Sequence, residues 1–150
     1  MQKTEMYQPS LQQGWEETKS FDIHRLFLVG FFGGAIPLII MGSMNAKWVR
    51  LSNKRIVALA LLGSLVVIGK YLVLLYMMQN SLTFDSSSMR IGYRVSCVLL
   101  YGAYFFALRK AFNSHRYLGG EMVPMLGTAI KWSLVGIGIE TIITATIINL

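Results

Sequence analysis

Apolar positions along this chain come in long runs that are separated by polar segments. Four apolar blocks cover about residues 26–44, 56–78, 89–108 and 125–148. Because a helix rises about 1.5 Å per residue and the hydrocarbon core of a bilayer is about 30 Å thick, roughly 20 apolar residues are enough to cross it. The pattern therefore predicts an all-α protein, an integral membrane bundle of four transmembrane helices.

A polar arm, residues 1–22, precedes these blocks. Its segment GWEETKSFD could form a short helix at the membrane interface, with Trp15 and Phe21 toward the acyl chains, or the arm could be a partly ordered tail. The arm is acidic and lacks the basic opening region of a secretory signal. We therefore expect all four blocks, within residues 23–150, to persist in the mature protein.

The first block, LFLVGFFGGAIPLIIMGSM, contains no charged residue. Gly30 and Gly34 form a GxxxG pair and Gly33 widens the flat surface, so another helix of the same chain can pack closely there. Pro37 has no amide hydrogen to donate. We expect it to kink the first span.

Arg94 interrupts the third block and leaves an uncharged run over residues 95–108. A run of this length could lie at the interface instead, and three spans would place the chain ends on opposite sides of the membrane. We expect a span, because Arg94 is near its end and its long side chain can reach the headgroups.

Basic residues gather in the loops that follow the first and third blocks. These two loops share one side of a four-span bundle and carry Lys47, Arg50, Lys54, Arg55, Arg109, Lys110 and Arg116. The other side carries Lys3, Lys19, Arg25 and Arg90. The positive-inside rule then places the basic loops in the cytoplasm and both termini outside. The net charge of +7 thus fits lipid headgroups, and we expect no nucleic-acid partner.

Two opposite charges lie inside the second and fourth blocks, at Lys70 and Glu140. A lysine in the hydrocarbon core costs about 2.5–3.5 kcal/mol unless something compensates it. Each charge lies about three residues beyond the centre of its span, and the two spans run in the same direction, so both reach nearly the same depth. We expect them to pair, with Arg94 at a somewhat shallower level.

Small residues accompany both charges at helical spacing. Ser133 and Gly136 share a stripe with Glu140, and Gly63 shares one with Lys70, so neighbouring helices can approach closely there. The charges could be a structural ion pair that determines which helices are neighbours. They could also form a polar site for a substrate or a proton.

Other chemistry is sparse in the sequence. Cys97 is the single cysteine and lies in an apolar block, while His24 and His115 lie beside predicted spans on opposite sides. No nucleophile elbow, zinc-protease helix or phosphate-binding loop is present. We expect no enzyme activity, no metal site and no cofactor.

Two segments resemble small bacterial membrane proteins of no assigned activity. In these proteins a Gly-Gly in the first span precedes an asparagine and a short basic segment, which here are Gly33, Gly34, Asn45, Lys47 and Arg50. The segment HRYLGGEMVPMLGTAIKWSLVGIG, with His115, Gly119 and Gly120, resembles the end of such proteins. The usual Gly-Gly-Pro is here Gly-Gly-Ala-Ile-Pro. The resemblance implies a bacterial membrane protein and carries no mechanism.

These patterns predict a non-enzymatic, multi-pass protein of the bacterial cytoplasmic membrane that acts by interaction. It would be an accessory subunit of a larger membrane complex, a homo-oligomer or an immunity-type protein. The alternative is a small oligomeric transporter or channel with Lys70, Glu140 and Arg94 along its path. A lipid-modifying enzyme would need a nucleophile and base, which the sequence does not show.

Overall fold

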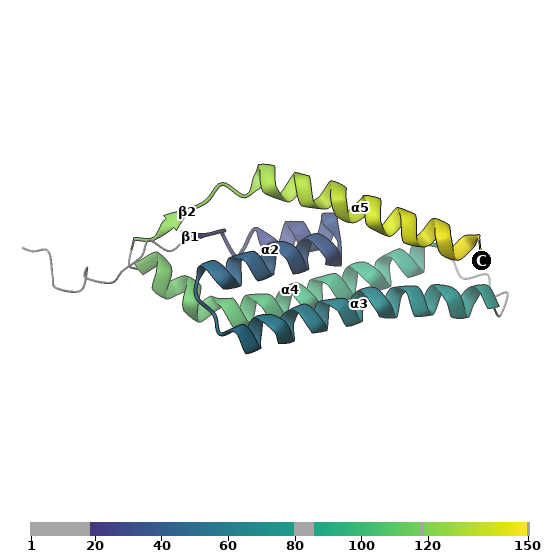
Figure 1. Ribbon diagram of the computed structural model, residues 1–150, viewed down its shortest axis with the longest axis horizontal. Coiled ribbons are helices and arrows are strands. Elements are labelled where there is room, and N and C mark those ends of the chain that lie inside the picture. The colour runs from purple at the N-terminus through teal and green to yellow at the C-terminus, as the bar shows by residue number, and fades with distance from the viewer. Residues whose placement is uncertain (1–18, 80–85, 118, 150) are drawn as a thin grey trace, which may run out of the picture.

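The computed structural model describes residues 19–79, 86–117 and 119–149, and these are mostly helical. In chain order the elements are β1 (Lys19–Ser20), α1 (Leu26–Leu28), the π-helix η2 (Val29–Gly33), α2 (Ala35–Trp48), α3 (Asn53–Gln79), α4 (Ser86–Tyr117), β2 (Glu121–Met122) and α5 (Leu126–Ile148). Most of the predicted N-terminal arm lies outside the described residues. Figure 1 shows the long helices side by side along the long axis of the molecule.

Three helices, α3, α4 and α5, are long and apolar enough to cross a membrane. They contain the predicted second, third and fourth spans, which are therefore confirmed as long apolar helices. Arg94 does not interrupt the third one, since α4 continues through it without a break. The multi-pass character predicted from the apolar blocks thus rests on these three helices.

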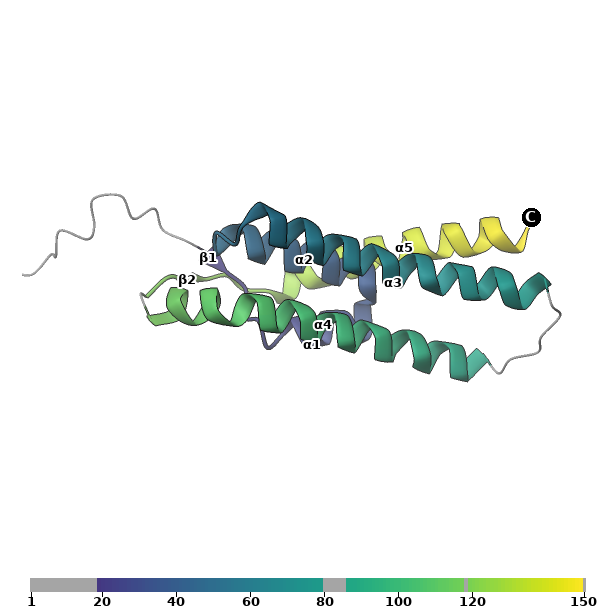
Figure 2. The same ribbon diagram turned by 90° about the horizontal axis from the view of Figure 1, so that it is seen from below.

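The first apolar block does not form the fourth spanning helix that the sequence predicts. It divides at Gly34, so that α1 and η2 lead in one direction and α2 returns beside them (Figures 1 and 2). The start and the end of this segment lie side by side, since the Phe21 amide donates to Asn45 Oδ1 at 2.8 Å. The Phe21 and Trp48 rings also lie 4.7 Å apart. Residues 21–48 therefore form a re-entrant hairpin.

Backbone geometry explains where the hairpin turns. Gly34 has φ +89°, a conformation that favours glycine and ends the preceding helix. Pro37 is the third residue of α2, where the amide that it lacks has no partner within the helix. The predicted kink at Pro37 is therefore wrong, because the chain turns three residues earlier and Pro37 lies in the first turn of the returning helix.

Length supports the same description of the hairpin. The 14 residues of α2 rise about 21 Å, which is less than the hydrocarbon thickness of about 30 Å. Non-helical backbone at this depth requires protein around it. The hairpin meets this requirement, since it packs against α3, α4 and α5.

The core of the molecule surrounds this hairpin. Its fully buried side chains come mainly from the hairpin and α4: Phe21, Ile23, Leu26, Leu38, Met41, Leu100, Tyr104 and Leu108. By contrast, α3 and α5 expose most of their apolar side chains, as helices in contact with lipid do. The hairpin thus fills the space between three lipid-facing helices.

A small parallel sheet joins the two segments that lead into the hairpin and into α5. Lys19 pairs with Glu121 in the strand register, and the Val123 amide donates to the Ser20 carbonyl at 2.9 Å. Lys19 therefore lies at the end where α5 begins, and Asn149 lies at the opposite end of α5. The prediction that both chain ends share one side is wrong for the described residues, because the hairpin returns to the end from which it started.

Candidate functional site

Three helices meet at the side chain of Glu140. Lys70 of α3 forms an ion pair with it, from Nζ to Oε2, and the two side chains are only 21% and 17% exposed. Tyr93 of α4 donates its hydroxyl to the other carboxylate oxygen at 2.6 Å. The predicted pair of charges on the second and fourth blocks is thus present and has a third partner.

The tip of the hairpin lies against the same carboxylate. The Ala35 amide, at the first residue of α2, donates to the Tyr93 hydroxyl at 3.1 Å. A Cβ atom added to Gly34 would lie 3.3 Å from Glu140 Oε1 and 3.3 Å from the Tyr93 oxygen. Since the N-terminus of a helix carries a partial positive charge, α2 also stabilises the carboxylate.

Aromatic rings surround the Lys70 ammonium. Its Nζ lies 4.4 Å from the centre of the Tyr93 ring and 5.1 Å from that of Tyr71, within the range of cation–π attraction. The Tyr71 hydroxyl donates to the Glu140 carbonyl at 3.2 Å. We call Lys70, Tyr71, Tyr93, Glu140 and the tip residues Gly34 and Ala35 the intramembrane cluster. Together these contacts offset much of the cost of burying both charges.

Small residues bring α5 against the hairpin. A Cβ atom added to Gly136 would lie 2.8 Å from Pro37 Cδ, and one added to Gly33 would meet both Pro37 and Ser133. Glu140 follows Gly136 by one helical turn, so this close packing directs it toward the tip. The predicted packing residues Gly33, Ser133 and Gly136 therefore all lie where the hairpin packs against α5.

The remaining predicted packing glycines also lie at helix contacts. A Cβ atom on Gly30 would meet the Leu38 side chain within the hairpin and, at 3.5 Å, the Cys97 carbonyl of α4. One on Gly63 of α3 would collide with Ile39 of α2. The GxxxG pair thus does not act as one surface, since Gly34 is the turn itself.

Arg94 does not join the cluster. Its guanidinium lies over the Phe31 ring, 5.5 Å from the ring centre, and Arg94 is exposed. The prediction of a three-residue charge cluster is therefore wrong for this position, because Arg94 faces η2 while its neighbour Tyr93 faces Glu140. Sequence reasoning missed Tyr71 and Tyr93, although both are hydroxyl groups within apolar blocks at the depth of the charges.

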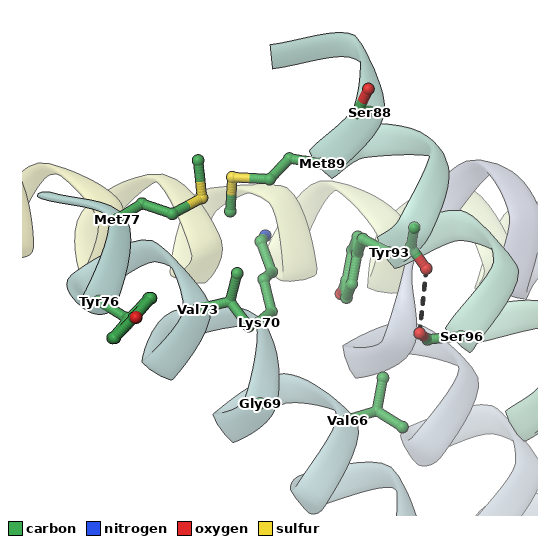
Figure 3. A pocket seen from close by; sticks show the side chains of 11 residues that line it. Val66, Gly69, Lys70, Val73, Tyr76, Met77, Ser88, Met89, Tyr93 and Ser96 are labelled. Atoms are coloured by element: carbon green, nitrogen blue, oxygen red, sulfur yellow. Dashed lines mark hydrogen bonds between the residues drawn. The ribbon is translucent and has the colours of Figure 1, made fainter. Parts of the chain in front are cut away.

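A cavity of about 590 Å³ lies between α3 and α4 beside the cluster. Its lining residues are Val66, Gly69, Lys70, Val73, Tyr76, Met77, Ser88, Met89, Gly92, Tyr93 and Ser96. Figure 3 shows Met77 and Met89 pointing toward each other beside the end of the Lys70 side chain. We call this space the α3–α4 cavity. It occupies the half of the bundle away from the basic loops.

A second cavity, of about 470 Å³ and wide open to the surface of the bundle, lies on the α5 side of the ion pair. Its lining residues are Lys70, Ile137, Glu140, Thr141, Thr144, Ala145 and Ile148. We call it the α3–α5 cavity. Lys70 borders both spaces, whereas Glu140 borders only this one. The ion pair therefore separates two cavities in the same half of the bundle.

The basic residues predicted to contact lipid headgroups lie around the end of the bundle that carries the small sheet, and so do the two histidines. That end holds Lys19, Arg25, Lys47, Arg50, Lys54, Arg55, Arg109, Lys110 and Arg116. His115 is buried and bonds the Glu121 carbonyl through Nε2 at 3.2 Å, while the His24 ring lies 5.4 Å from the Phe105 ring of α4. The predicted placement of the two histidines on opposite sides is thus wrong, since the hairpin returns His24 to this end.

Several residues of the motifs that resemble small bacterial membrane proteins form turns or buried hydrogen bonds in this fold. Gly34 and Gly119 have positive φ, and Asn45 is fully buried against Ser20 and Phe21. Within the described residues no three His, Cys, Asp or Glu side chains lie close enough to hold a metal ion. Cys97 is buried in the core.

Comparison of the chain with protein-family models, with curated proteins and with solved structures found no match. What the intramembrane cluster does must therefore be inferred from its geometry.

Proposed function

We propose that the protein moves protons across the membrane, alone or together with a small solute, and that Glu140 is the proton acceptor. One observation carries this proposal: the tip of the re-entrant hairpin meets the Lys70–Glu140 pair between two cavities. It favours the transporter alternative over a purely structural ion pair. The predicted role as an accessory or immunity-type protein stays a prediction.

Because of the contacts around Glu140, its protonation would change the bonding of Lys70, Tyr93 and the hairpin tip. A proton on the carboxylate removes the negative charge that holds the Lys70 ammonium and attracts the N-terminus of α2. Tyr93 links the carboxylate to the Ala35 amide, so its hydroxyl would also change partners. Protonation thus weakens the attachment of the hairpin tip, which is the only element of the cluster that does not cross the membrane.

Packing on the other side of the cluster explains why the hairpin would have to move. Between the cluster and the basic end, Leu38, Met41, Leu100 and Tyr104 are buried in a dense core. The two cavities that border the ion pair lie on the opposite side of the cluster. A groove of about 530 Å³ between the hairpin and α5 lies on the basic side, but neither Lys70 nor Glu140 lines it. Transporters use broken helices whose termini meet the bound ion or substrate near mid-membrane, and alternate access by moving elements around that site. Here the hairpin is the element in the corresponding place.

Charge distribution supports an orientation for this movement. The end with the small sheet carries most of the bases, while Arg90 lies at the opposite end. We propose that the basic end faces the cytoplasm and that the cavities face the outside of a bacterial cytoplasmic membrane. Three spans and a hairpin form few walls, so we propose a homo-oligomer as the working unit.

Proton flux into vesicles tests the proposed function. Purified protein is reconstituted into liposomes that contain a trapped pH dye. Proton entry is driven either by a potassium diffusion potential with valinomycin, which moves protons alone, or by an inward gradient of a small solute, which moves protons together with that solute. We expect faster acidification than in empty liposomes, and Glu140→Gln should return the rate to the empty-liposome level. Lys131→Met is the matched control, because Lys131 is an exposed charge on the same helix.

Folding of each variant is checked by circular dichroism and gel filtration in mild detergent. Wild-type flux equal to that of empty liposomes, with protein correctly inserted, would overturn the proposal. So would a Glu140→Gln variant that conducts as well as wild type.

A further inference from the structure

We infer that the α3–α4 cavity binds an amphiphilic monoanion, such as a medium-chain carboxylate, together with one proton on Glu140. This inference rests on the proposed function, since it names the class of solute that accompanies the proton.

The walls of the cavity fit an apolar tail. Val66, Val73, Met77 and Met89 line it on both sides (Figure 3), and methionine side chains adapt readily to flexible ligands. Its volume of about 590 Å³ lies within the range of small-molecule sites. A hydrated inorganic ion would find few polar partners on these walls.

The polar groups of the cavity favour an anionic head. Lys70 is the charged residue of the lining, and Ser88 adds a hydroxyl group, while the Ser96 hydroxyl donates to the Gly92 carbonyl and the lining contains no acidic residue. Glu140 lies behind Lys70 and borders the other cavity. A carboxylate that enters therefore meets Lys70 first.

Electroneutrality couples this anion to a proton. Lys70 and Glu140 together carry no net charge, so a bound monoanion would leave one buried negative charge in excess. A proton on Glu140 restores neutrality and frees the Lys70 ammonium for the bound anion. A bound organic cation would instead have to compete with Lys70 for one carboxylate.

The groups around Glu140 leave it as the site of that proton. Lys70 and Tyr71 face it from α3, and Tyr93 faces it from α4, with Cys97 one turn further along that helix. The hairpin contributes only Gly34 and Ala35, which have no titratable side chain. On α5 itself, Lys131 is more than two turns away and exposed. Glu140 is thus the carboxyl group of the cluster.

Octanoate binding tests the inference. Radiolabelled octanoate is titrated against the full chain in nanodiscs of neutral phosphatidylcholine, with empty nanodiscs as the baseline, at mildly acid and mildly alkaline pH. We expect saturable binding that is at least about tenfold tighter at acid pH. In weakly buffered solution at alkaline pH, saturation should take up one proton per octanoate bound.

Two charge variants separate the roles of the pair. Lys70→Met should lose saturable binding at both pH values. Glu140→Gln, which mimics the protonated carboxyl group, should bind octanoate equally well at both pH values and take up no proton. A Glu140→Gln variant that binds more weakly than wild type at alkaline pH would overturn the inference.

A pair of glycine variants tests the location. A Cβ atom added to Gly92, which lines the cavity, meets nothing within 4 Å, so Gly92→Leu has room to begin a bulky side chain at the wall of the cavity. We expect at least about a tenfold loss of octanoate affinity. Gly102→Leu is the matched control, since Gly102 lies on the same helix in equally open space outside the lining. Equal affinity in the two variants would overturn the inference.

The test also distinguishes this inference from the proposed function. Proton flux in liposomes without any octanoate binding would overturn the choice of a carboxylate and leave proton movement standing. Octanoate binding with proton uptake, but without flux, would overturn transport and leave the binding site standing. Octylammonium that binds more tightly than octanoate would reverse the assigned charge of the ligand and overturn the inference.

Discussion

At the scale of single residues, a buried charge in this protein is defined by all of its partners. The Lys70 ammonium has a carboxylate and two aromatic rings around it, and Glu140 has an ammonium, a phenol and a helix N-terminus. Neither charge is tolerable in hydrocarbon without the other. A structural pair and a proton-accepting pair therefore make the same first prediction about stability.

Removing one charge should destabilise the protein more than removing both. Lys70→Met and Glu140→Gln should each lower the free energy of unfolding by about 3 kcal/mol, because each leaves an uncompensated buried group. The double variant should lose less than either single variant. Unfolding in mixed detergent micelles measures the three losses, with Lys131→Met as the exposed control. Losses that simply add would mean that the two side chains do not interact.

At the scale of elements, the re-entrant hairpin is the feature that distinguishes this fold from a simple bundle. The hairpin turns at Gly34, and Asn45 joins its two ends by accepting a hydrogen bond from the Phe21 amide. Pro37 begins the returning helix without loss of a hydrogen bond. These three residues explain why a continuous apolar run, long enough to span, instead folds back.

A side chain at the hairpin tip should disturb the site more than the fold. Gly34→Val forces a β-branched residue into a positive φ, at a cost of about 1–3 kcal/mol, and crowds Glu140 and Tyr93. We expect a severalfold loss of proton flux in liposomes. Gly138→Val is the control, because Gly138 lies within α5 and a Cβ atom added there would meet nothing within 4 Å. Equal flux in the two variants would mean that the tip has no part in transport.

Removing the hydrogen bonds that join the two ends of the hairpin should lower the stability of the protein more than it disturbs the site. Asn45→Ala removes the acceptor of the Phe21 amide and of the Ser20 hydroxyl, all within a buried region. The expected loss is about 1–3 kcal/mol in free energy of unfolding. Thermal unfolding in detergent measures it, and Asn113→Ala, at an exposed position of α4, should change little. A similar small effect at Asn45 would mean that the arms are held together by other contacts.

At the scale of the whole molecule, the hairpin determines the topology. It returns the chain to the end from which it entered, so the bases near Lys19 join those of the two loops. The basic residues of the described chain are thereby divided more unequally between the two ends of the bundle than they would be with four spans. The positive-inside rule is correspondingly better satisfied.

Cysteine labelling distinguishes the two topologies. In a Cys97→Ala background, single cysteines replace Lys19, Ser52 or Asn149 in bacterial cells. The hairpin predicts that a membrane-impermeant maleimide labels intact cells only at position 149, and that positions 19 and 52 react together after permeabilisation. Four spans would place positions 19 and 52 on opposite sides, so labelling of intact cells at only one of these two would contradict the hairpin.

Local hydropathy determined most of what could be predicted from the sequence. A long apolar run satisfies its own backbone as a helix, so α3, α4 and α5 followed from composition and length. The depth of Lys70 and Glu140 followed from the helical rise, which is equally local. Few other charged residues lie at that depth, so the two opposite charges were expected to pair.

Only the tertiary structure decided the course of the first apolar block, the partners Tyr71 and Tyr93, and the separate place of Arg94. An apolar run can cross the bilayer or fold back within protein, and its composition is the same in both cases. The choice depends on contacts distant in sequence, such as Asn45 with Phe21 and Gly136 with Pro37. The rotation of each helix depends on the same contacts, which is why Tyr93 reaches Glu140 while its neighbour Arg94 does not.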